Sequence, residues 1–302
     1  MLLILANLKH VYCDKNLHLN KQHGFTVELY KKSIVYSKNQ GAGYPRLLAR
    51  EQYSLKVNDT HSMIDLENIL NNEYIGLLLV GTPPQEIHFM FDTGSSDVWM
   101  PSINCTTCYH HAKYDSSKSI SYRKSEKFDG NNASFKIDYG SGTVAGVIGT
   151  DVIMFGSLEV RGLRFGDATF EDSSLSKFRM DGIFGLGFAG LSRITKPTSL
   201  ELLARSFSDI PNMFSFFLTS NPADVTSKSM LIYGGYNLSL VSPNATWFYT
   251  PVIQLSESPT YWTTAMTHFD LISAEMYSSR RPLSSFPLTS VGLLFSYCST
   301  DK

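Results

Sequence analysis

Apolar runs of strand length, separated by turn residues, dominate the chain between about residues 74 and 233. The apolar run 74–81 and the alternating run 86–91 are joined by Thr82-Pro83-Pro84, which predicts two strands and a turn. Further strands are predicted at residues 134–139, 146–155, 158–165, 213–219 and 229–233. Because Gly, Ser, Asn and Asp separate these runs, the pattern predicts an all-β protein.

One segment has the character of a helix. Thr198 or Ser199 is a capping residue in front of residues 200–207. Glu201 near the start and Arg205 near the end match the helix dipole. Residues 115–121 predict a shorter helix or turn.

Composition and charge limit the function. The 302 residues are 43% hydrophobic and 18% charged, which is typical of one large or two medium globular domains. The net charge of −1 argues against a nucleic-acid binder, and no apolar run approaches the ~20 residues of a membrane span. We therefore expect no nucleic-acid partner and no membrane span.

The N-terminal residues 1–61 differ from the rest. Residues 1–57 carry nine Lys and Arg against three acidic residues, 9 − 3 = +6. Such an arm can bind an acidic surface, cover an acidic cleft of its own chain, or remain a solvated tail. The apolar residues 1–8 are interpreted as a signal-sequence remnant, and five Asn-x-Ser/Thr sequons are compatible with the secretory pathway: Asn58, Asn104, Asn132, Asn237 and Asn244.

The four cysteines are Cys13, Cys105, Cys108 and Cys298. The spacing of Cys105 and Cys108 fits a small disulfide loop, a redox pair or half a zinc site, and His110 and His111 keep zinc open. The sequence has no second Cys/His cluster at ligand spacing, so a disulfide is favoured over metal. No metal and no cofactor are predicted.

Asp92 is the strongest candidate for chemistry. It stands in Phe91-Asp92-Thr93-Gly94-Ser95-Ser96, directly after an apolar run. An ordinary Asp-x-Gly turn would explain three of these residues. The longer string FDTGSSDVWMPS at residues 91–102 closely resembles the first active-site segment of the pepsin family of aspartic peptidases.

Other segments resemble the same family in the expected order. They are YIGLLLVGTPPQ (74–85), FKIDYGSGTVAGVIGTD (135–151), DGIFGLG (181–187), FSFFLTSN (214–221), Tyr233-Gly234-Gly235 and Tyr261-Trp262. The resemblance covers roughly residues 62–270. It implies a bilobal pepsin-like acid protease fold, with a complete N-terminal lobe at 62–236 and the start of a C-terminal lobe at 237–270.

The resemblance assigns roles to individual residues. Asp92 would be a catalytic aspartate, held by Thr93, Gly94 and Ser95. Tyr139 would lie over the substrate on a flap with Gly140, Ser141 and Gly142, supported by the indole N–H of Trp99. Ile183 and Phe184 would line an apolar pocket, although packing in the core explains them equally. Cys105 and Cys108 would form a disulfide, and residues 1–61 would be a basic propeptide.

The second half of the catalytic pair is missing from these 302 residues. Two carboxyls that share a proton activate water and polarise the carbonyl in this mechanism, but Asp92-Thr93-Gly94 is the one Asp-Thr/Ser-Gly present. The family places the second near residues 284–290, which contain no Asp. A splicing or reading-frame product at 271–302, a non-catalytic protein, or a homodimer pairing two Asp92 loops would explain this, the homodimer least well.

The sequence therefore predicts an aspartic endopeptidase that acts on polypeptides at acid pH, with this chain itself short of a catalytic residue. The alternative is a secreted, non-catalytic peptide-binding protein of the same fold. A monomer is expected, either secreted or in an acidic vacuolar or lysosomal compartment.

Overall fold

The computed structural model describes residues 2–6, 61–69, 73–128, 131–219, 228–240, 252, 257–263, 268–269 and 281–282. Most of the basic arm 1–61, most of the segment 271–302 and the sequons at Asn58 and Asn244 lie outside the described residues. The helices found in the described part are all short, and none is long and apolar enough to cross a membrane.

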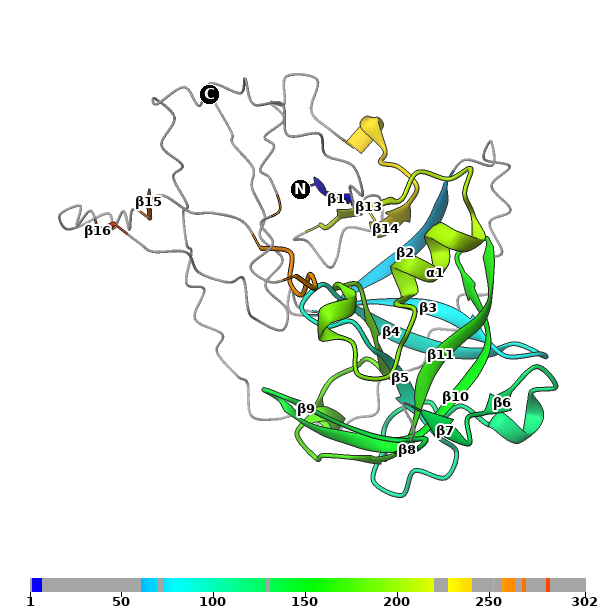
Figure 1. Cartoon of the computed structure of the whole chain (residues 1–302). Helices are drawn as coiled ribbons and strands as arrows, with labels where there is room; N and C mark the ends of the chain where they lie inside the picture. The colour runs from blue at the N-terminus through cyan, green and yellow to red at the C-terminus, as the bar shows by residue number, and fades with distance from the viewer. Residues whose placement is uncertain are drawn as a thin grey trace.

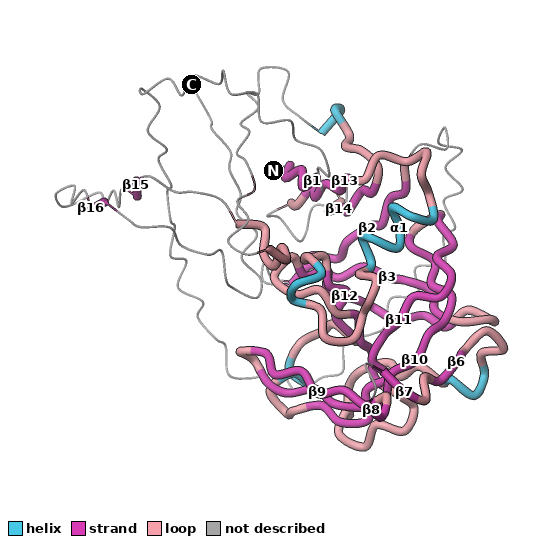
Figure 2. The backbone as a smooth tube through the Cα atoms, viewed as in Figure 1, coloured by secondary structure: helices cyan, strands magenta, loops and turns pink. Residues whose placement is uncertain are grey.

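Strands make up about half of the described chain and are its main regular structure, as Figure 2 shows. They are β1 (Leu2–Ala6), β2 (Ser62–Ile69), β3 (Glu73–Val80), β4 (Gln85–Asp92), β5 (Val98–Pro101), β6 (Arg123–Lys124), β7 (Lys127–Phe128), β8 (Asn131–Asn132), β9 (Ser134–Tyr139), β10 (Gly142–Phe155), β11 (Leu158–Glu171), β12 (Gly182–Gly185), β13 (Met213–Phe217), β14 (Ser229–Tyr233), β15 (His268–Phe269) and β16 (Arg281–Pro282). The helices are α1 (Ser199–Ser206) and the 3₁₀ turns Ser116–Lys118, Leu175–Lys177, Ala189–Leu191 and Leu238–Leu240.

Twelve strands form one sheet in the order β1-β13-β14-β2-β3-β4-β12-β5-β11-β10-β6, with β9 paired to β10. Figure 1 shows this sheet folding round on itself, so that β3 also pairs with β10. The long β10 and β11 form an antiparallel hairpin with two irregularities in register. Closure of this kind places the ends of β4, β12 and β5 side by side in the interior.

The interior consists of two clusters of buried apolar residues. The larger includes the aromatic rings of Phe89, Phe91, Phe155 and Phe184, with neighbouring centroids 5.3–6.0 Å apart. The smaller surrounds Trp99 and lies under β9 and β10. Alternation along the strands directs one side chain in two towards these clusters, which fits the period of the sequence pattern.

The predicted helix is present as α1, which packs against β11. Thr198 is the N-cap: its hydroxyl accepts from the Glu201 N–H, and the Glu201 carboxylate accepts from the Thr198 N–H. This capping box satisfies two N–H groups that the helix itself leaves unpaired. The weaker prediction at 115–121 is a single 3₁₀ turn, Ser116–Lys118, capped by Asp115.

Candidate active site

Asp92 is the last residue of β4, and its position is set by β12, which runs parallel beside it. Gly185 of β12 is the register partner of Asp92, and the Leu186 N–H donates to the Asp92 carbonyl at 2.8 Å. A Cβ on Gly185 would lie 2.5–2.6 Å from backbone atoms of Ser96 and Asp97. Only glycine therefore allows β12 to pass this close to the Asp92 loop.

The Asp92 carboxyl is buried, with 5% of the residue exposed. Its Oδ1 accepts from the Gly94 N–H at 2.8 Å, whereas Oδ2 has no hydrogen-bond partner within the described part of the chain. Burial raises the pKa of Asp92, and the nearby Ser95 hydroxyl and Gly94 N–H offset part of that rise. Although Ser95 Oγ is near enough to influence the carboxyl, it makes no hydrogen bond of standard geometry.

The loop after Asp92 is fixed by its backbone. The Gly187 N–H donates to the Ser95 carbonyl at 2.7 Å, and the Ser96 hydroxyl donates to the Phe188 carbonyl at 2.7 Å. Thr93 lies half-buried in the turn. The buried indole N–H of Trp262 donates to the Leu186 carbonyl at 2.9 Å, so this tryptophan joins the same support.

A hairpin of β9 and β10 carries Tyr139, with Gly140 and Ser141 in its turn and Gly142 at the start of β10. The buried Trp99 indole N–H donates to the Tyr139 hydroxyl at 3.0 Å. Burial, followed by the negative charges of Asp97 and Asp92, raises the pKa of Tyr139, so its phenol is neutral and available as a donor. The space beside Gly140 is open, since a Cβ there would meet nothing within 4 Å.

Ile183 and Phe184 are both packed in the interior. Phe184 stacks among Phe89, Phe91 and Phe155 in the larger cluster, and Ile183 belongs to the cluster around Trp99. Their exposed fractions are 1% and 2%. Their contacts are those of core residues, and a pocket-lining role has no support from these contacts.

Asp97 is a buried residue beside the site that the sequence reasoning did not single out. Its Oδ1 accepts from the Ser192 hydroxyl and from the N–H groups of Ile194 and Thr195 at 2.8–2.9 Å, and Oδ2 accepts from the Arg193 N–H at 2.9 Å. The carboxylate thereby anchors the loop that passes beside the Asp92 segment. The sequence did carry a signal for this anchor: Asp97 directly precedes the apolar run 98–101. A carboxylate that is buried with such a run needs hydrogen-bond donors from elsewhere in the chain.

Cys105 and Cys108 are joined by a disulfide with a Cα–Cα distance of 5.7 Å. His110 is exposed, and His111 is buried and faces Glu171 rather than the cysteines. In the part of the chain that the structure describes, no three His, Cys, Asp or Glu residues form a metal-binding group.

The fold and this site define the class of protein. A family model described as eukaryotic aspartyl protease matches residues 73–283, which is more than half of the chain. The chain belongs to this family, whose curated members here include the pepsin-like cathepsin E and vacuolar protease A.

Individual relatives support the same family assignment. Cathepsin E of Cavia porcellus is 36% identical over 219 residues, covering 71% of this chain and 52% of the relative. An aspartic proteinase of Oryza sativa is 34% identical over 242 residues, covering 78% and 46%. Vacuolar protease A of Neurospora crassa is 37% identical over 179 residues, covering 58% and 42%. The chain therefore spans about half the length of the curated relatives it matches.

Proposed function

We propose that this chain carries the first catalytic loop of an acid endopeptidase, in which Asp92 is one of two carboxyls that activate water. One observation supports this most directly: the buried Asp92 carboxyl has Oδ1 fixed by the Gly94 N–H, while Oδ2 lacks a partner among the described residues. A buried oxygen without a partner is costly, so it suits a place where water or a second carboxyl binds.

The hairpin of β9 and β10 would act as the flap over a polypeptide substrate. Tyr139 is fixed by Trp99, and the neutral phenol lies within electrostatic reach of Asp92. A closed flap would exclude water around the scissile amide and so strengthen the polar interactions of the reacting groups. Thr93, Ser95 and Gly94 would keep the carboxyl in place, with Ser141, Gly140 and Gly142 giving the hairpin turn its freedom.

The reaction needs a second carboxyl that the 302 residues do not supply in an Asp-Thr/Ser-Gly sequence. Asp92 alone would accept a proton from water but would have no protonated neighbour to polarise the carbonyl. We therefore propose that a polypeptide of these residues alone does not hydrolyse peptides. The proposed division is a lobe at 62–236, the beginning of a second at 237–270, and a distinct segment at 271–302.

A cleavage assay tests the first carboxyl. The full chain and Asp92→Asn are incubated at about pH 4 with an unfolded protein, and released peptides are measured. We expect no release above the level of the variant. In a chain extended by a second Asp-Thr/Ser-Gly loop, we expect activity that Asp92→Asn lowers at least about a hundredfold. Activity of the extended chain that is unchanged in Asp92→Asn would overturn the assignment of Asp92.

The absent second motif favours one rival function, a non-catalytic protein that binds peptides with the same cleft. Reading the transcript beyond codon 268 separates the two. An in-frame second Asp-Thr/Ser-Gly supports the peptidase, whereas a transcript that encodes the 302 residues without one supports the binding protein.

We further propose a monomeric protein of the secretory pathway, either secreted or in an acidic vacuolar or lysosomal compartment. The Cys105–Cys108 disulfide supports an oxidising compartment. Polypeptides are the proposed substrates.

A further inference from the structure

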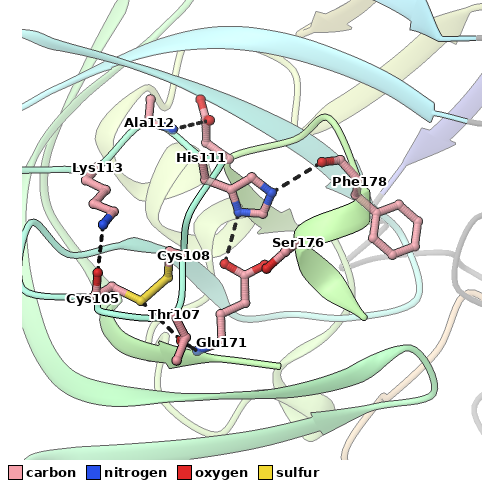
Figure 3. A network of polar contacts seen from close by, with 10 residues as sticks. Cys105, Thr107, Cys108, His111, Ala112, Lys113, Glu171, Ser176 and Phe178 are labelled. Carbon is pink, nitrogen blue, oxygen red and sulfur yellow. Dashed lines mark hydrogen bonds and ion pairs between the residues drawn. A yellow bond between two sulfur atoms is a disulfide. The ribbon is translucent and has the colours of Figure 1, made fainter. Parts of the chain in front are cut away.

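His111 is a buried histidine that the proposed reaction does not use. Its side chain is 2% exposed and that of Glu171 is fully buried. Figure 3 shows the imidazole lying between the Glu171 carboxylate and the Phe178 carbonyl. Nδ1 is 2.9 Å from Glu171 Oε2, and Nε2 is 3.2 Å from the Phe178 oxygen.

These two contacts limit where the protons are. A carbonyl oxygen only accepts hydrogen bonds, so Nε2 carries a proton. A second proton lies between Nδ1 and Glu171, because two bare acceptors would not meet at 2.9 Å in the interior. The pair is then neutral as a whole, with an imidazolium facing a carboxylate as its charged form.

The two partners of His111 stand at opposite ends of one short segment, residues 171–178. Glu171 ends β11, and Phe178 follows the 3₁₀ turn Leu175–Lys177. A further tie comes from the neighbouring Cys105–Cys108 loop: the Glu171 N–H donates to the Thr107 hydroxyl at 2.9 Å. His111, three residues after this loop, therefore fastens both ends of segment 171–178 (Figure 3).

Segment 171–178 lies under the flap. The Asp172 N–H donates to the Thr143 carbonyl at 2.9 Å, next to the flap turn. A Cβ on Gly142 would lie 3.0 Å from Asp172 and 3.2 Å from Leu175, so the flap backbone rests directly on these side chains. The buried Leu175 also shares a cluster with Ile137 and Val144 of the flap strands.

We propose that His111 is a positioning residue that, while it holds two protons, fixes segment 171–178 and through it the flap. When His111 loses the second proton, the Phe178 contact can remain, but Glu171 becomes a buried carboxylate without a donor from the ring. That state is costly, so the segment loosens and the flap with it.

Besides Glu171, Asp181 is the charged group that acts on His111. Asp181 faces it from the segment after Phe178 and accepts from the Ala112 N–H at 2.6 Å and from the His88 N–H at 2.8 Å. Lys113 donates to the Cys105 carbonyl at 2.7 Å, and Glu73 accepts from the Arg179 N–H at 2.7 Å. Burial lowers the pKa of His111, but the hydrogen bond and charge of Glu171, together with the Phe178 carbonyl and the charge of Asp181, outweigh burial and leave that pKa raised.

The direction of the pH dependence follows from the raised pKa of His111. The fastening is complete below the ordinary value of 6.5 and is lost as pH rises through the higher folded value. An acid compartment would thus keep the flap ordered, and solution above the raised folded pKa of His111 would release it. The link to catalysis rests on the proposed function, but the fastening can be measured without any peptide cleavage.

Hydrogen exchange of the flap, residues 135–148, tests the proposal in the full chain between pH 5 and 8, corrected for the intrinsic rates. Above the folded pKa of His111 we expect protection to fall by up to about tenfold per pH unit. His111→Gln should lose this slope and show, already at pH 5, the lower protection that the unmodified chain reaches above the folded pKa of His111. Glu171→Gln should also lose the slope, because no buried carboxylate remains and the amide can donate to the neutral Nδ1. The control His88→Gln should keep the slope.

An unchanged slope in His111→Gln, or loss of the slope in His88→Gln alone, would overturn the proposal. Nitrogen NMR of the unmodified chain gives an answer even where a variant does not fold. It should show both ring nitrogens of His111 protonated at pH 5, and a neutral ring at that pH also overturns the proposal. Neither result bears on whether Asp92 is catalytic, so the two proposals fail separately.

Discussion

At the residue scale, buried carboxyls are the features that most set this chain apart from a generic β protein. Asp92, Asp97, Asp151, Asp167 and Glu171 are each at most 5% exposed. The Asp97 carboxylate accepts hydrogen bonds from one loop, and the Glu171 carboxylate pairs with His111. Asp92 and Asp167 each keep an oxygen without a partner in the described residues. Burial raises the pKa of both, so each favours the protonated form.

Asp167 gives a quantitative prediction. Burial raises its pKa from 3.8 to about 6, with Ser102 and Tyr122 partly opposing. Because the native state favours the protonated acid, stability falls as pH rises from about 4 to above 6. The difference corresponds to about 3 kcal/mol at 1.36 kcal/mol per pH unit. About 1 kcal/mol of this loss has already occurred at pH 4.5, so Asp167→Asn should gain about 2 kcal/mol on the unmodified chain between pH 4.5 and pH 7.5, measured by urea unfolding.

The matched control is Asp65→Asn, because the Asp65 side chain is 67% exposed. It should leave the pH dependence of unfolding as it is in the unmodified chain. If Asp167→Asn also leaves it unaltered, the buried carboxyl is not the source of the loss at neutral pH.

At the element scale, the close approach of β12 to the Asp92 loop decides the site. Sequence pattern predicted β3, β4, β9, β10, β13 and β14 to within a few residues, and α1 with its cap. For these elements the period of the hydrophobic pattern and the turn residues were enough to predict the secondary structure. The short strands β5 and β12 gave no periodic signal, because both are buried on every side. The place of β12 beside the Asp92 loop came from family resemblance, and the pairing of β5 with β12 and β11 came from the tertiary fold.

Gly185→Ala tests that approach. The added Cβ would lie 2.5–2.6 Å from backbone atoms of Ser96 and Asp97, which cannot rotate away. We expect a loss of about 1–3 kcal/mol of unfolding free energy, or failure to fold. Gly140→Ala is the control, since nothing lies within 4 Å of its added Cβ, and it should cost less than about 0.5 kcal/mol. Equal unfolding free energies for the two variants would contradict the close packing of β12.

At the scale of the whole molecule, the perturbed groups act together. The raised pKa values of His88, held by Asp181, and of His111 stabilise the fold below 6.5 and lose that effect as pH rises. Asp92 and Asp167 also destabilise as they ionise above their ordinary range, since burial raises the pKa of each. Asp115, Asp138 and Asp172 have lowered pKa values from nearby hydroxyl, backbone and lysine groups, and they lose stabilisation in stronger acid.

These contributions predict a maximum of stability in mildly acid solution, near pH 4 to 5, and a steady decline towards pH 8. Urea midpoints across pH 3 to 8 give the measurement. A maximum at neutral pH would contradict the prediction, because every raised group listed above works against it. The predicted maximum of stability near pH 4 to 5 would suit the acidic compartment proposed for this protein.

The sequence by itself determined the β class, the strands with clear alternation, the capped helix, and Asp92 as the residue to examine. It did so because period, caps and turn chemistry are local properties of the chain. Only the tertiary structure decided what surrounds each group: the strand β12 beside Asp92, the Trp99–Tyr139 hydrogen bond, the Asp97 anchor and the His111 fastening. Those contacts join residues far apart in sequence, and burial and partner, which set each pKa, exist only once the sheet has closed.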